Sequence, residues 1–316
     1  MNLALVGGPQ GRLIEIAGAI GKKGTESDLI IFDRKTDEKC LSIVIPKSYP
    51  ERMQPLLQSL NMADAVIFVP ETVDSIAGEI IVATGCVGRG GTLLSDADTA
   101  ARLLPLLRAS GNEWAHMETG DDTTRELREK LWNMKIQRRE NEEHWRVDVD
   151  HSFEVRGVGT VVLGVVKYGR VKVHDRLLNV QAGKEGMIRS IQIFDEDVPE
   201  ASAGSRVGLA LKGLTVEQLP RGTVLTNDMH FEASNEITIE FKKEKYFKDA
   251  LQPGKAIHLS AGLQCKEAKI ISSDGNMELE TAEPVAFGDE MGVLFQARPP
   301  SGLRIAGSGR MGKLLK

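Results

Sequence analysis

The sequence has few cysteines and no long hydrophobic run, and both absences limit what the protein can be. Its 316 residues include only three cysteines, which stand far apart at Cys40, Cys86 and Cys265. Without a CxxC pair or a cysteine–histidine cluster, neither a disulfide framework nor a structural zinc site is expected. No apolar run reaches the roughly 18 residues of a membrane-spanning helix. The N-terminus lacks the basic stretch of a signal peptide and is predicted to be a strand. We therefore expect no membrane association and a reducing, cytoplasmic location.

An excess of basic charge is also missing, since the formal net charge is -5. This argues against a histone-like protein that binds nucleic acid by overall charge, and we expect no DNA partner. RNA stays compatible, because recognition of a tRNA end needs only a local patch. The six histidines show no metal-ligand spacing, so no metal is expected.

Residues 1–145 alternate short apolar runs with helical stretches. Strands are predicted at 3–6, 29–32, 41–45, 65–69, 92–94 and 114–117, and helices at 12–20, 50–60, 74–82, 98–107 and 123–143. Strands that alternate with helices are typical of a doubly wound, mostly parallel sheet. We therefore predict an N-terminal α/β domain.

After His144 the helical periodicity disappears. Short β-branched runs separated by glycines, such as Gly157, Gly159, Gly164 and Gly169, favour β-barrels or sandwiches. A second break falls near residue 228. The predicted fold class is thus multidomain, with an α/β P-loop-like domain at 1–145 followed by two β-barrel domains at 146–227 and 228–316.

Two stretches resemble domain 2 of the EF-Tu and SelB family of translation elongation factors. They are DHSFEVRGVGTVVLGVVKYGRVKVHDRL, at 150–177, and IRSIQIFDEDVPEASAGSRVGLALKGLTVEQLPRGTVL, at 188–225. The form GVGTVVLG is nearer to SelB, because EF-Tu usually carries an arginine where Val158 stands. LRIAGSGRMGKLL, at 303–315, resembles the closing hairpin of the third SelB domain. The resemblance implies an archaeal-like, SelB-related paralogue with a nucleotide domain, a tRNA-binding barrel and a third barrel.

The nucleotide site of the family is degenerate here. The family carries a G-x-x-x-x-G-K-[ST] loop, whose amides, lysine and hydroxyl hold phosphates and Mg²⁺. This sequence reads GGPQGRL from Gly7, with Gly11 and Arg12 near the second glycine and the lysine. Leu13 cannot replace the metal-binding hydroxyl, and Pro9 lacks an amide donor. Arg12 still offers a positive charge.

The other nucleotide signatures are eroded as well. In the family, the motif DxPGH comes first, then a helix, and then a strand that contains ADxA. This sequence has the ADxA strand at 62–66. The segment that corresponds to DxPGH, at 44–49, lacks the aspartate, the glycine and the histidine. Residues 95–98 stand where the family has the motif NKxD, which recognises the guanine base. Asp98 either pairs with guanine or belongs to a helix N-cap, and we favour the helix N-cap. Gly24-Thr25 is either a remnant of the first switch or a plain loop.

We therefore expect no catalytic residue and absent or very slow GTP hydrolysis. Any remaining cofactor would be GTP or GDP, held weakly by Gly7, Gly11, Arg12 and Asp98.

The barrel keeps positions that the resemblance assigns to the aminoacylated tRNA end. Asp150 stands where the family has an acidic residue, Phe153 where it has a pocket aromatic, and Gly204 where a backbone amide contacts the terminal nucleotide. Arg206 replaces an asparagine that contacts the aminoacyl group, which predicts a more cationic pocket and an altered amino-acid specificity. The alternatives are an inward-facing barrel residue for Phe153 and a solvent-facing loop for Arg206.

A basic run with aromatics is the candidate patch for tRNA phosphates. It consists of Lys242, Lys243, Lys245 and Lys248. A solvated hairpin is the favoured alternative. Arg138-Arg139 is interpreted as a charged face of the helix predicted at 123–143.

The sequence thus predicts a monomeric, elongation-factor-like protein that binds aminoacyl-tRNA after losing GTP hydrolysis. A role on the ribosome is left open. Two other functions are also left open: a working guanine-nucleotide switch with non-standard contacts, and a protein-interaction scaffold that no longer binds RNA.

Overall fold

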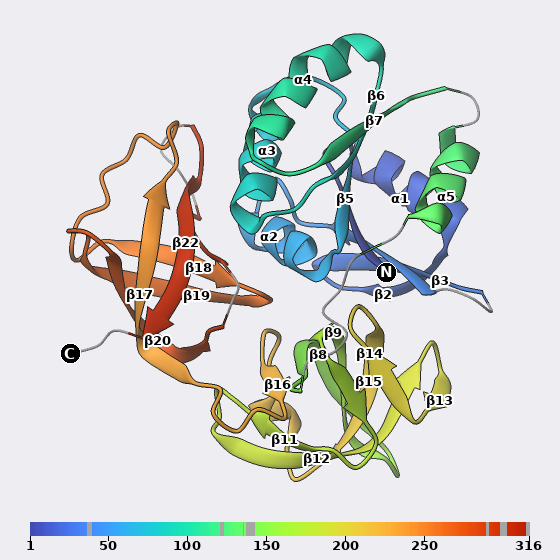
Figure 1. The fold of residues 1–316 in the computed structure, drawn as a ribbon, viewed down its shortest axis with the longest axis vertical. Coiled ribbons are helices and arrows are strands. Elements are labelled where there is room, and N and C mark those ends of the chain that lie inside the picture. The colour runs from blue at the N-terminus through green and yellow to red at the C-terminus, as the bar shows by residue number, and fades with distance from the viewer. Residues whose placement is uncertain are drawn as a thin grey trace. The chain divides into compact units, whose positions relative to one another are not determined.

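The computed structural model describes residues 1–36, 40–120, 123–134, 136, 143–288, 291–297 and 302–313. It contains an α/β part followed by two closed β-barrels (Figure 1), which confirms the predicted fold class. Its packing gives two compact units. The first unit is Met1–Ile136, Lys242–Asp249 and Val293–Ser308, and the second unit is Gln137–Phe241, Ala250–Gly292 and Gly309–Lys316. The domain boundaries at 145 and 227 stay a prediction.

The first unit is built around a seven-stranded sheet of order β2-β3-β4-β1-β5-β6-β7. Its strands are β1 (Asn2–Val6), β2 (Lys22–Glu26), β3 (Leu29–Lys35), β4 (Cys40–Pro46), β5 (Ala65–Phe68), β6 (Gly91–Ser95) and β7 (Trp114–Glu118). The ladders among β4, β1, β5, β6 and β7 are parallel, whereas β2 and β3 run antiparallel to their neighbours. The predicted, mostly parallel sheet is therefore confirmed.

Helices cover both faces of this sheet (Figure 1). They are α1 (Gln10–Ile20), α2 (Met53–Met62), α3 (Ser75–Val87), α4 (Ala97–Ala109) and α5 (Thr123–Asn133). Helix α1 packs against α5, whereas α2, α3 and α4 contact one another in series. Leu13, Ile16 and Leu127 join the apolar side chains of the strands in one buried core, because the apolar positions recur at helical spacing.

Two predictions in this part need correction. The plain-loop alternative for Gly24-Thr25 is wrong, because the two residues lie in β2, whose pairing with β3 shifts register between Lys23 and Glu26. That they are a remnant of the first switch stays a prediction. The side chains of β2 are mostly exposed. Backbone hydrogen bonds therefore hold this strand, and its sequence shows no alternation of apolar residues that would have predicted it. The helix predicted at 123–143 ends at Asn133. Arg138-Arg139 lies outside the described residues.

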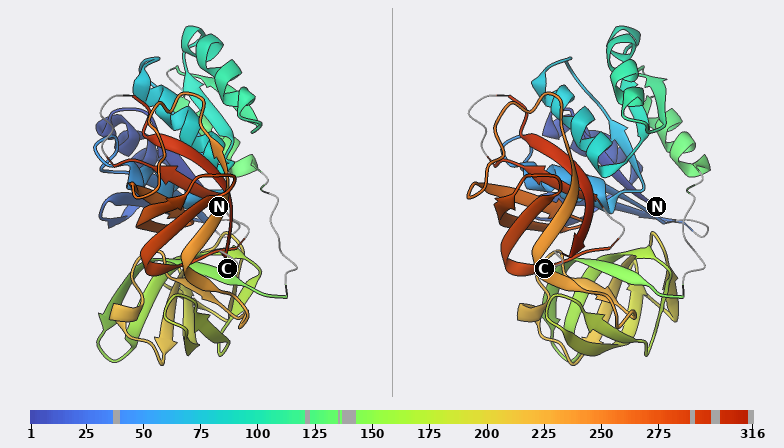
Figure 2. Two further views of the ribbon diagram at one scale, coloured as in Figure 1. Left: turned by 90° about the vertical axis from the view of Figure 1, so that its left-hand side faces the viewer. Right: turned by 60° about the vertical axis from the view of Figure 1, so that its left-hand side comes forward.

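The first barrel belongs to the second unit and follows the order β11-β16-β8-β9-β15-β12-β13, closed by pairing of β11 with β12. Its strands are β8 (Arg146–Val155), β9 (Gly159–Tyr168), β11 (Arg176–Asn179), β12 (Lys184–Ile193), β13 (Glu196–Val198), β15 (Arg206–Lys212) and β16 (Val224–Thr226). A small sheet of β10 (Arg170–Lys172) and β14 (Glu200–Ser202) and a 3₁₀ turn η1 (Val216–Gln218) complete it. Figure 2 shows this barrel, in yellow-green, from two further sides.

The last barrel closes in the order β17-β20-β19-β18-β21-β22. Its strands are β17 (Ala233–Lys243), β18 (Ala256–Ala261), β19 (Gln264–Ser272), β20 (Met277–Ala286), β21 (Met291–Phe295) and β22 (Ile305–Lys313). Of the helices within the described part of the chain, none is long and apolar enough to cross a membrane.

Candidate functional site

The turn between β1 and α1 stands where the family resemblance places a phosphate loop. Gly7 has φ +107°, and a Cβ there would stand 2.6 Å from ring atoms of Phe68 at the end of β5. The glycine is therefore required by close packing against the neighbouring strand, whether or not a phosphate ever binds.

The groups that hold phosphates in the family are absent or displaced in this turn. Pro9 occupies the N-cap position of α1 and forms no side-chain cap hydrogen bond. Leu13 is 4% exposed and belongs to the hydrophobic core. Gly11 and Arg12 are exposed on the first turn of α1. Of the predicted nucleotide contacts, only Gly7 lies in the cavity beside this turn.

That cavity measures about 220 Å³, and we call it the P-loop cavity. It lies at the carboxyl ends of β1 and β4, where ligands bind in doubly wound sheets. Among the described residues that line it, the charged side chains are Glu71 and Asp74, and none is basic. Asp74 caps α3 by accepting a hydrogen bond from the backbone N–H of Ala77 at 2.9 Å. This bond holds the pKa of Asp74 below its usual value, so the carboxylate stays ionised.

Asp98 lies apart from the P-loop cavity. It is exposed in the first turn of α4. The cap of this helix is Asp96, which accepts hydrogen bonds from the backbone N–H of Thr99 at 2.8 Å and from its hydroxyl at 2.9 Å. The helix-cap reading of this run is therefore confirmed, with Asp96 as the capping residue, whereas guanine pairing by Asp98 stays a prediction.

A buried ionic cluster adjoins the P-loop cavity, and the sequence did not reveal it. It consists of Tyr49, Glu79 and Arg304, all in the first unit, and we call it the Arg304 cluster. The Arg304 Nε donates to Glu79 Oε1 at 3.0 Å, and a second guanidinium nitrogen also pairs with Glu79. Nη1 donates to the Pro50 carbonyl at 2.7 Å. The guanidinium lies 5.6 Å from the Tyr49 ring centroid, and the Tyr49 hydroxyl donates to Glu79 at 3.2 Å.

The Arg304 cluster fixes the protonation of its members. Burial raises the pKa of Tyr49, and the charge of Glu79 raises it further. Burial alone would lower the pKa of Arg304, but the hydrogen bonds and charge of Glu79 outweigh this effect and raise the pKa. Tyr49 therefore stays neutral and Arg304 stays charged.

In the first barrel, the structure brings Asp150 and Arg206 together. Asp150 sits where the β8–β9 ladder shifts register between Val149 and His151, a bulge of the kind that redirects a side chain. The Arg206 Nε donates to the Asp150 carboxylate at 3.1 Å, and the two side chains are 12% and 4% exposed. Arg221 Nε donates to the Asp150 backbone carbonyl at 2.9 Å.

This pairing changes the expectation for Arg206. The residue begins β15, so it does not lie in a solvent-facing loop. Because its charge is paired with a buried carboxylate, Arg206 does not make the site a simple cationic pocket.

Phe153 is partly exposed and lies outside the buried barrel core, so the alternative of an inward-facing barrel residue is wrong. Its ring lies 5.8 Å from that of His151 in a tilted arrangement. The two residues stand two positions apart on β8, so they share one face of the strand. The two rings therefore form an aromatic pair on β8, in which Phe153 stands three residues along the strand from Asp150.

Gly204 has φ +80°, and its backbone N–H donates to the Val166 carbonyl at 2.7 Å. This amide already has a partner within the barrel. Contact of Gly204 with a terminal nucleotide stays a prediction, and it would use another atom or a shared hydrogen bond.

The four lysines of the predicted phosphate patch are all exposed, at the end of β17 and in the turn that follows. Tyr246, between them, is 65% exposed, and Lys245 Nζ lies 5.6 Å from its ring centroid. Phe247 is buried and anchors the turn. An exposed ring among lysines is compatible with a phosphate patch and equally with a solvated turn.

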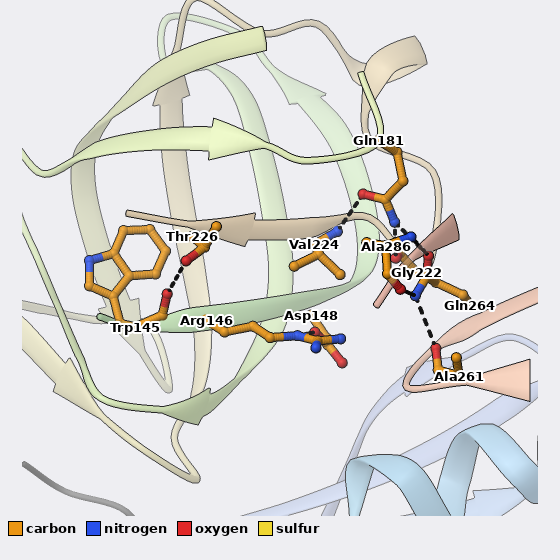
Figure 3. Close-up of polar contacts among 10 residues, drawn as sticks. All are labelled: Trp145, Arg146, Asp148, Gln181, Gly222, Val224, Thr226, Ala261, Gln264 and Ala286. Carbon is orange, nitrogen blue, oxygen red and sulfur yellow. Dashed lines mark hydrogen bonds and ion pairs between the residues drawn. The ribbon is translucent and has the colours of Figure 1, made fainter. Parts of the chain in front are cut away.

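A glutamine network joins the two barrels within the second unit (Figure 3). Gln181 Nε2 donates to the Gly222 carbonyl and to Gln264 Oε1, both at 2.9 Å. Gln264 in turn exchanges hydrogen bonds with the backbone of Ala286 at 2.7 and 2.8 Å. A Cβ at Gly222, which has φ +91°, would approach the Gln264 Cα to 2.8 Å. These hydrogen bonds hold the segments around Gln181, Gly222 and Gln264 close together. The local sequence around each residue does not predict this contact.

The comparisons with known proteins agree with this architecture. Residues 159–226 match the family model for elongation factor Tu domain 2. An uncharacterized protein of Methanocaldococcus jannaschii is 32% identical over 307 residues, which is 95% of this chain and 97% of that protein. The selenocysteine-specific elongation factor of the same organism is 31% identical over 59% of this chain. The chain belongs to the EF-Tu/SelB-type family of translation elongation factors. It spans 45% of the length of that selenocysteine-specific factor.

The solved structure of elongation factor SelB from Methanococcus maripaludis, in complex with the GTP analogue GppNHp, shares the fold of this family member. Its TM-score is 0.78 at 21% identity, over 99% of this chain and 79% of that chain. The predicted family is confirmed, and the protein is elongation-factor-like with a SelB-like fold.

Proposed function

We propose that this elongation-factor-like protein binds aminoacyl-tRNA through the first barrel and neither requires nor hydrolyses GTP. The observation that carries the proposal is the buried Asp150–Arg206 pair at the β8 bulge, on the same strand as the partly exposed ring of Phe153. A fixed charge pair and an aromatic ring on one strand of the barrel offer hydrogen bonds to an aminoacyl group and a surface for an unstacked base.

The geometry of the P-loop cavity supports the loss of the nucleotide. Triphosphate binding needs backbone amides, a lysine and a metal-binding hydroxyl. Here Pro9 replaces an amide donor, and Leu13 is buried in the core. Glu71 and Asp74 line the cavity, and their negative charge repels phosphate groups.

The Arg304 cluster supports the loss of switching. Arg304 binds the carbonyl of Pro50 and packs over Tyr49, in the segment where relatives carry DxPGH. A nucleotide shifts a conformation only if it contacts two states differently. A segment held by a buried ion pair offers no second state for such contacts.

A protection assay tests the proposal. The protein is mixed with a pool of charged tRNAs, and the hydrolysis rate of each aminoacyl ester is measured with and without it. Selenocysteyl-tRNA comes first, because one relative is named for selenocysteine. Slower deacylation of at least one species supports the proposal, and unchanged rates for every species would sink it. The alternative of a protein-interaction scaffold predicts unchanged rates.

GTP turnover is expected to be absent. Without a metal-binding hydroxyl or a residue to position water, nothing organises attack on the γ-phosphate. Phosphate release is measured with Mg²⁺ and GTP, beside authentic elongation factor Tu as the positive control. Turnover comparable to that control would revive the alternative of a working nucleotide switch, and nucleotide-dependent tRNA affinity would support that alternative further.

The lysine patch is expected to contribute salt-dependent affinity. Replacing Lys242 and Lys245 with alanine should weaken tRNA binding uniformly across tRNA species, and should reduce the slope of log K against log salt by about 1 per lysine. Binding is measured by filter retention at several salt concentrations. Lys184→Ala, an exposed lysine of the first barrel, serves as the control. Equal slopes for the double variant and this control would favour the solvated turn.

A further inference from the structure

The turn at Arg221 and Gly222 lies between the Asp150–Arg206 pair and the glutamine network. On one side of this turn, Arg221 Nε donates to the Asp150 backbone carbonyl at 2.9 Å, and the Gly222 N–H donates to the Val149 carbonyl at 2.8 Å. Both acceptors belong to the segment in which the ladder of β8 with β9 shifts register. The turn therefore holds the backbone of the bulge from which the Asp150 side chain reaches Arg206.

On its other side, the turn is held by Gln181. Gln181 Nε2 donates to the Gly222 carbonyl at 2.9 Å, and Oε1 accepts the backbone N–H of Val224 at 2.9 Å. Nε2 also donates to Gln264 Oε1 at 2.9 Å. One side chain thus binds the backbone on both flanks of Thr223 and binds the last barrel as well (Figure 3). A polar network whose members are hydrogen-bonded in this way makes the local structure rigid.

The hairpin between β18 and β19 supports the turn from the last barrel. Gln264 is 2% exposed and exchanges hydrogen bonds with the backbone of Ala286, so its side chain is fixed within that barrel. At the hairpin tip, a Cβ on Gly262, which has φ +56°, would stand 2.8 Å from Asp148 Oδ2. Asp148 is buried on β8, two residues before Asp150. The hairpin therefore packs both against β8 and, through Gln264, against the turn that holds the bulge of β8.

We propose that Gln181 is a positioning residue for the Asp150–Arg206 pair, and that the last barrel, through Gln264 and Gly262, fixes the geometry of this pair. The inference rests on the proposed function, in which the pair receives the aminoacyl end of the tRNA. A hydrogen bond weakens steeply when its length or angle departs from the optimum. A shift of the turn moves the Asp150 backbone and misaligns its carboxylate with the guanidinium. Recognition of the aminoacyl group thus depends on side chains that do not touch it.

Gln181→Met and Gly262→Ala test the proposal on the full chain. Methionine keeps the length of the Gln181 side chain but removes its three hydrogen bonds, and the Cβ of Gly262→Ala displaces the hairpin from Asp148. For a tRNA that the wild type protects, filter retention is measured with the aminoacylated and the deacylated form. We expect each variant to bind the aminoacylated form about three- to tenfold more weakly, as residues without ligand contact do, and the deacylated form unchanged.

Asn112→Leu is the matched control. Asn112 carries a half-buried amide in the first unit, and its Nδ2 donates to the Ser110 hydroxyl at 3.2 Å. Loss of this hydrogen bond should leave the affinity for both forms of the tRNA unchanged. Circular dichroism shows which variants are folded. Equal weakening for the aminoacylated and deacylated forms, or wild-type affinity in folded Gln181→Met and Gly262→Ala, would overturn the proposal.

A double-mutant cycle gives a second readout that needs no tRNA. The unfolding equilibrium constant is measured for Gln181→Met, for the pair variant Asp150→Asn with Arg206→Gln, and for their combination. Because residues of one hydrogen-bond network are coupled, we expect the effects to depart from additivity by about threefold or more. Additive effects would contradict a positioning role for Gln181. If the wild type protects no aminoacyl-tRNA, the proposed function fails, and the cycle alone decides whether Gln181 positions the pair.

Discussion

Replacing Arg304 with methionine is expected to lower the free energy of unfolding by about 3–5 kcal/mol. The substitution keeps the length of the side chain but removes the partner of Glu79, whose side chain is 9% exposed. The Glu79 carboxylate would then be a buried charge without compensation. The Pro50 carbonyl would also lose its hydrogen bond from Nη1. Chemical denaturation followed by circular dichroism measures the change.

Two further variants separate this effect from general loss of a surface charge. Lys266→Met breaks the ion pair with Glu283, whose side chain is 68% exposed, and should cost no more than about 1 kcal/mol. The double variant Glu79→Gln and Arg304→Met removes the uncompensated charge, while the amide oxygen still accepts the backbone N–H of Arg304. It should recover about 1–2 kcal/mol relative to Arg304→Met. Equal stability of Arg304→Met and Lys266→Met would show that the Arg304 cluster contributes no more to the free energy of unfolding than an exposed ion pair.

The cluster also bears on the proposed loss of nucleotide switching. In a switching protein, the segment after β4 must be free to move when the γ-phosphate binds or leaves. Here Tyr49 and Pro50 are tied to Arg304, which is itself paired with Glu79 on α3. The interactions that hold this segment come from the protein itself, as the proposed loss of switching requires.

Local patterns predicted most of the fold because they record burial directly. The run from Leu3 to Val6 is apolar at every position and forms the buried β1. The order of motifs at 150–225 identified the first barrel, because glycines and β-branched residues recur where strands bend and end. The strand at Gly24-Thr25 was missed because exposed side chains leave no hydrophobic period.

The site was harder to predict because its decisive contacts join distant residues. Glu79 and Arg304 are 225 positions apart, and nothing near either residue indicates the other. Arg206 was expected to add positive charge, yet its pairing with Asp150, 56 positions away, neutralises that charge. Sequence reasoning named both residues of this pair but not their interaction. The family resemblance placed both an arginine and an aspartate in the same pocket. If both side chains are buried there, each needs the opposite charge as a partner, so their ion pair could have been predicted.

Replacing Arg206 with alanine is expected to cost about 3–5 kcal/mol of stability, because it leaves the Asp150 carboxylate buried without its partner. The loss should also weaken protection of aminoacyl-tRNA, if the guanidinium contacts the aminoacyl group. These two effects must be separated. The double variant Asp150→Asn and Arg206→Gln keeps a hydrogen bond between uncharged side chains, and we expect it to regain most of the stability, because no buried charge is left unpaired.

The double variant therefore tests function without the confusion of unfolding. If the charge pair contacts the aminoacyl end, the double variant should fold and yet protect aminoacyl-tRNA at least about tenfold less well, since truncated charged contacts cost about 2 kcal/mol or more. Arg189→Ala serves as the control, because Arg189 is an exposed arginine of the same barrel that donates to the Val158 carbonyl. It should leave protection unchanged. A folded double variant that protects as well as the wild type would mean that the pair only stabilises the bulge of β8, and that specificity for the tRNA end lies with Phe153 and its neighbours.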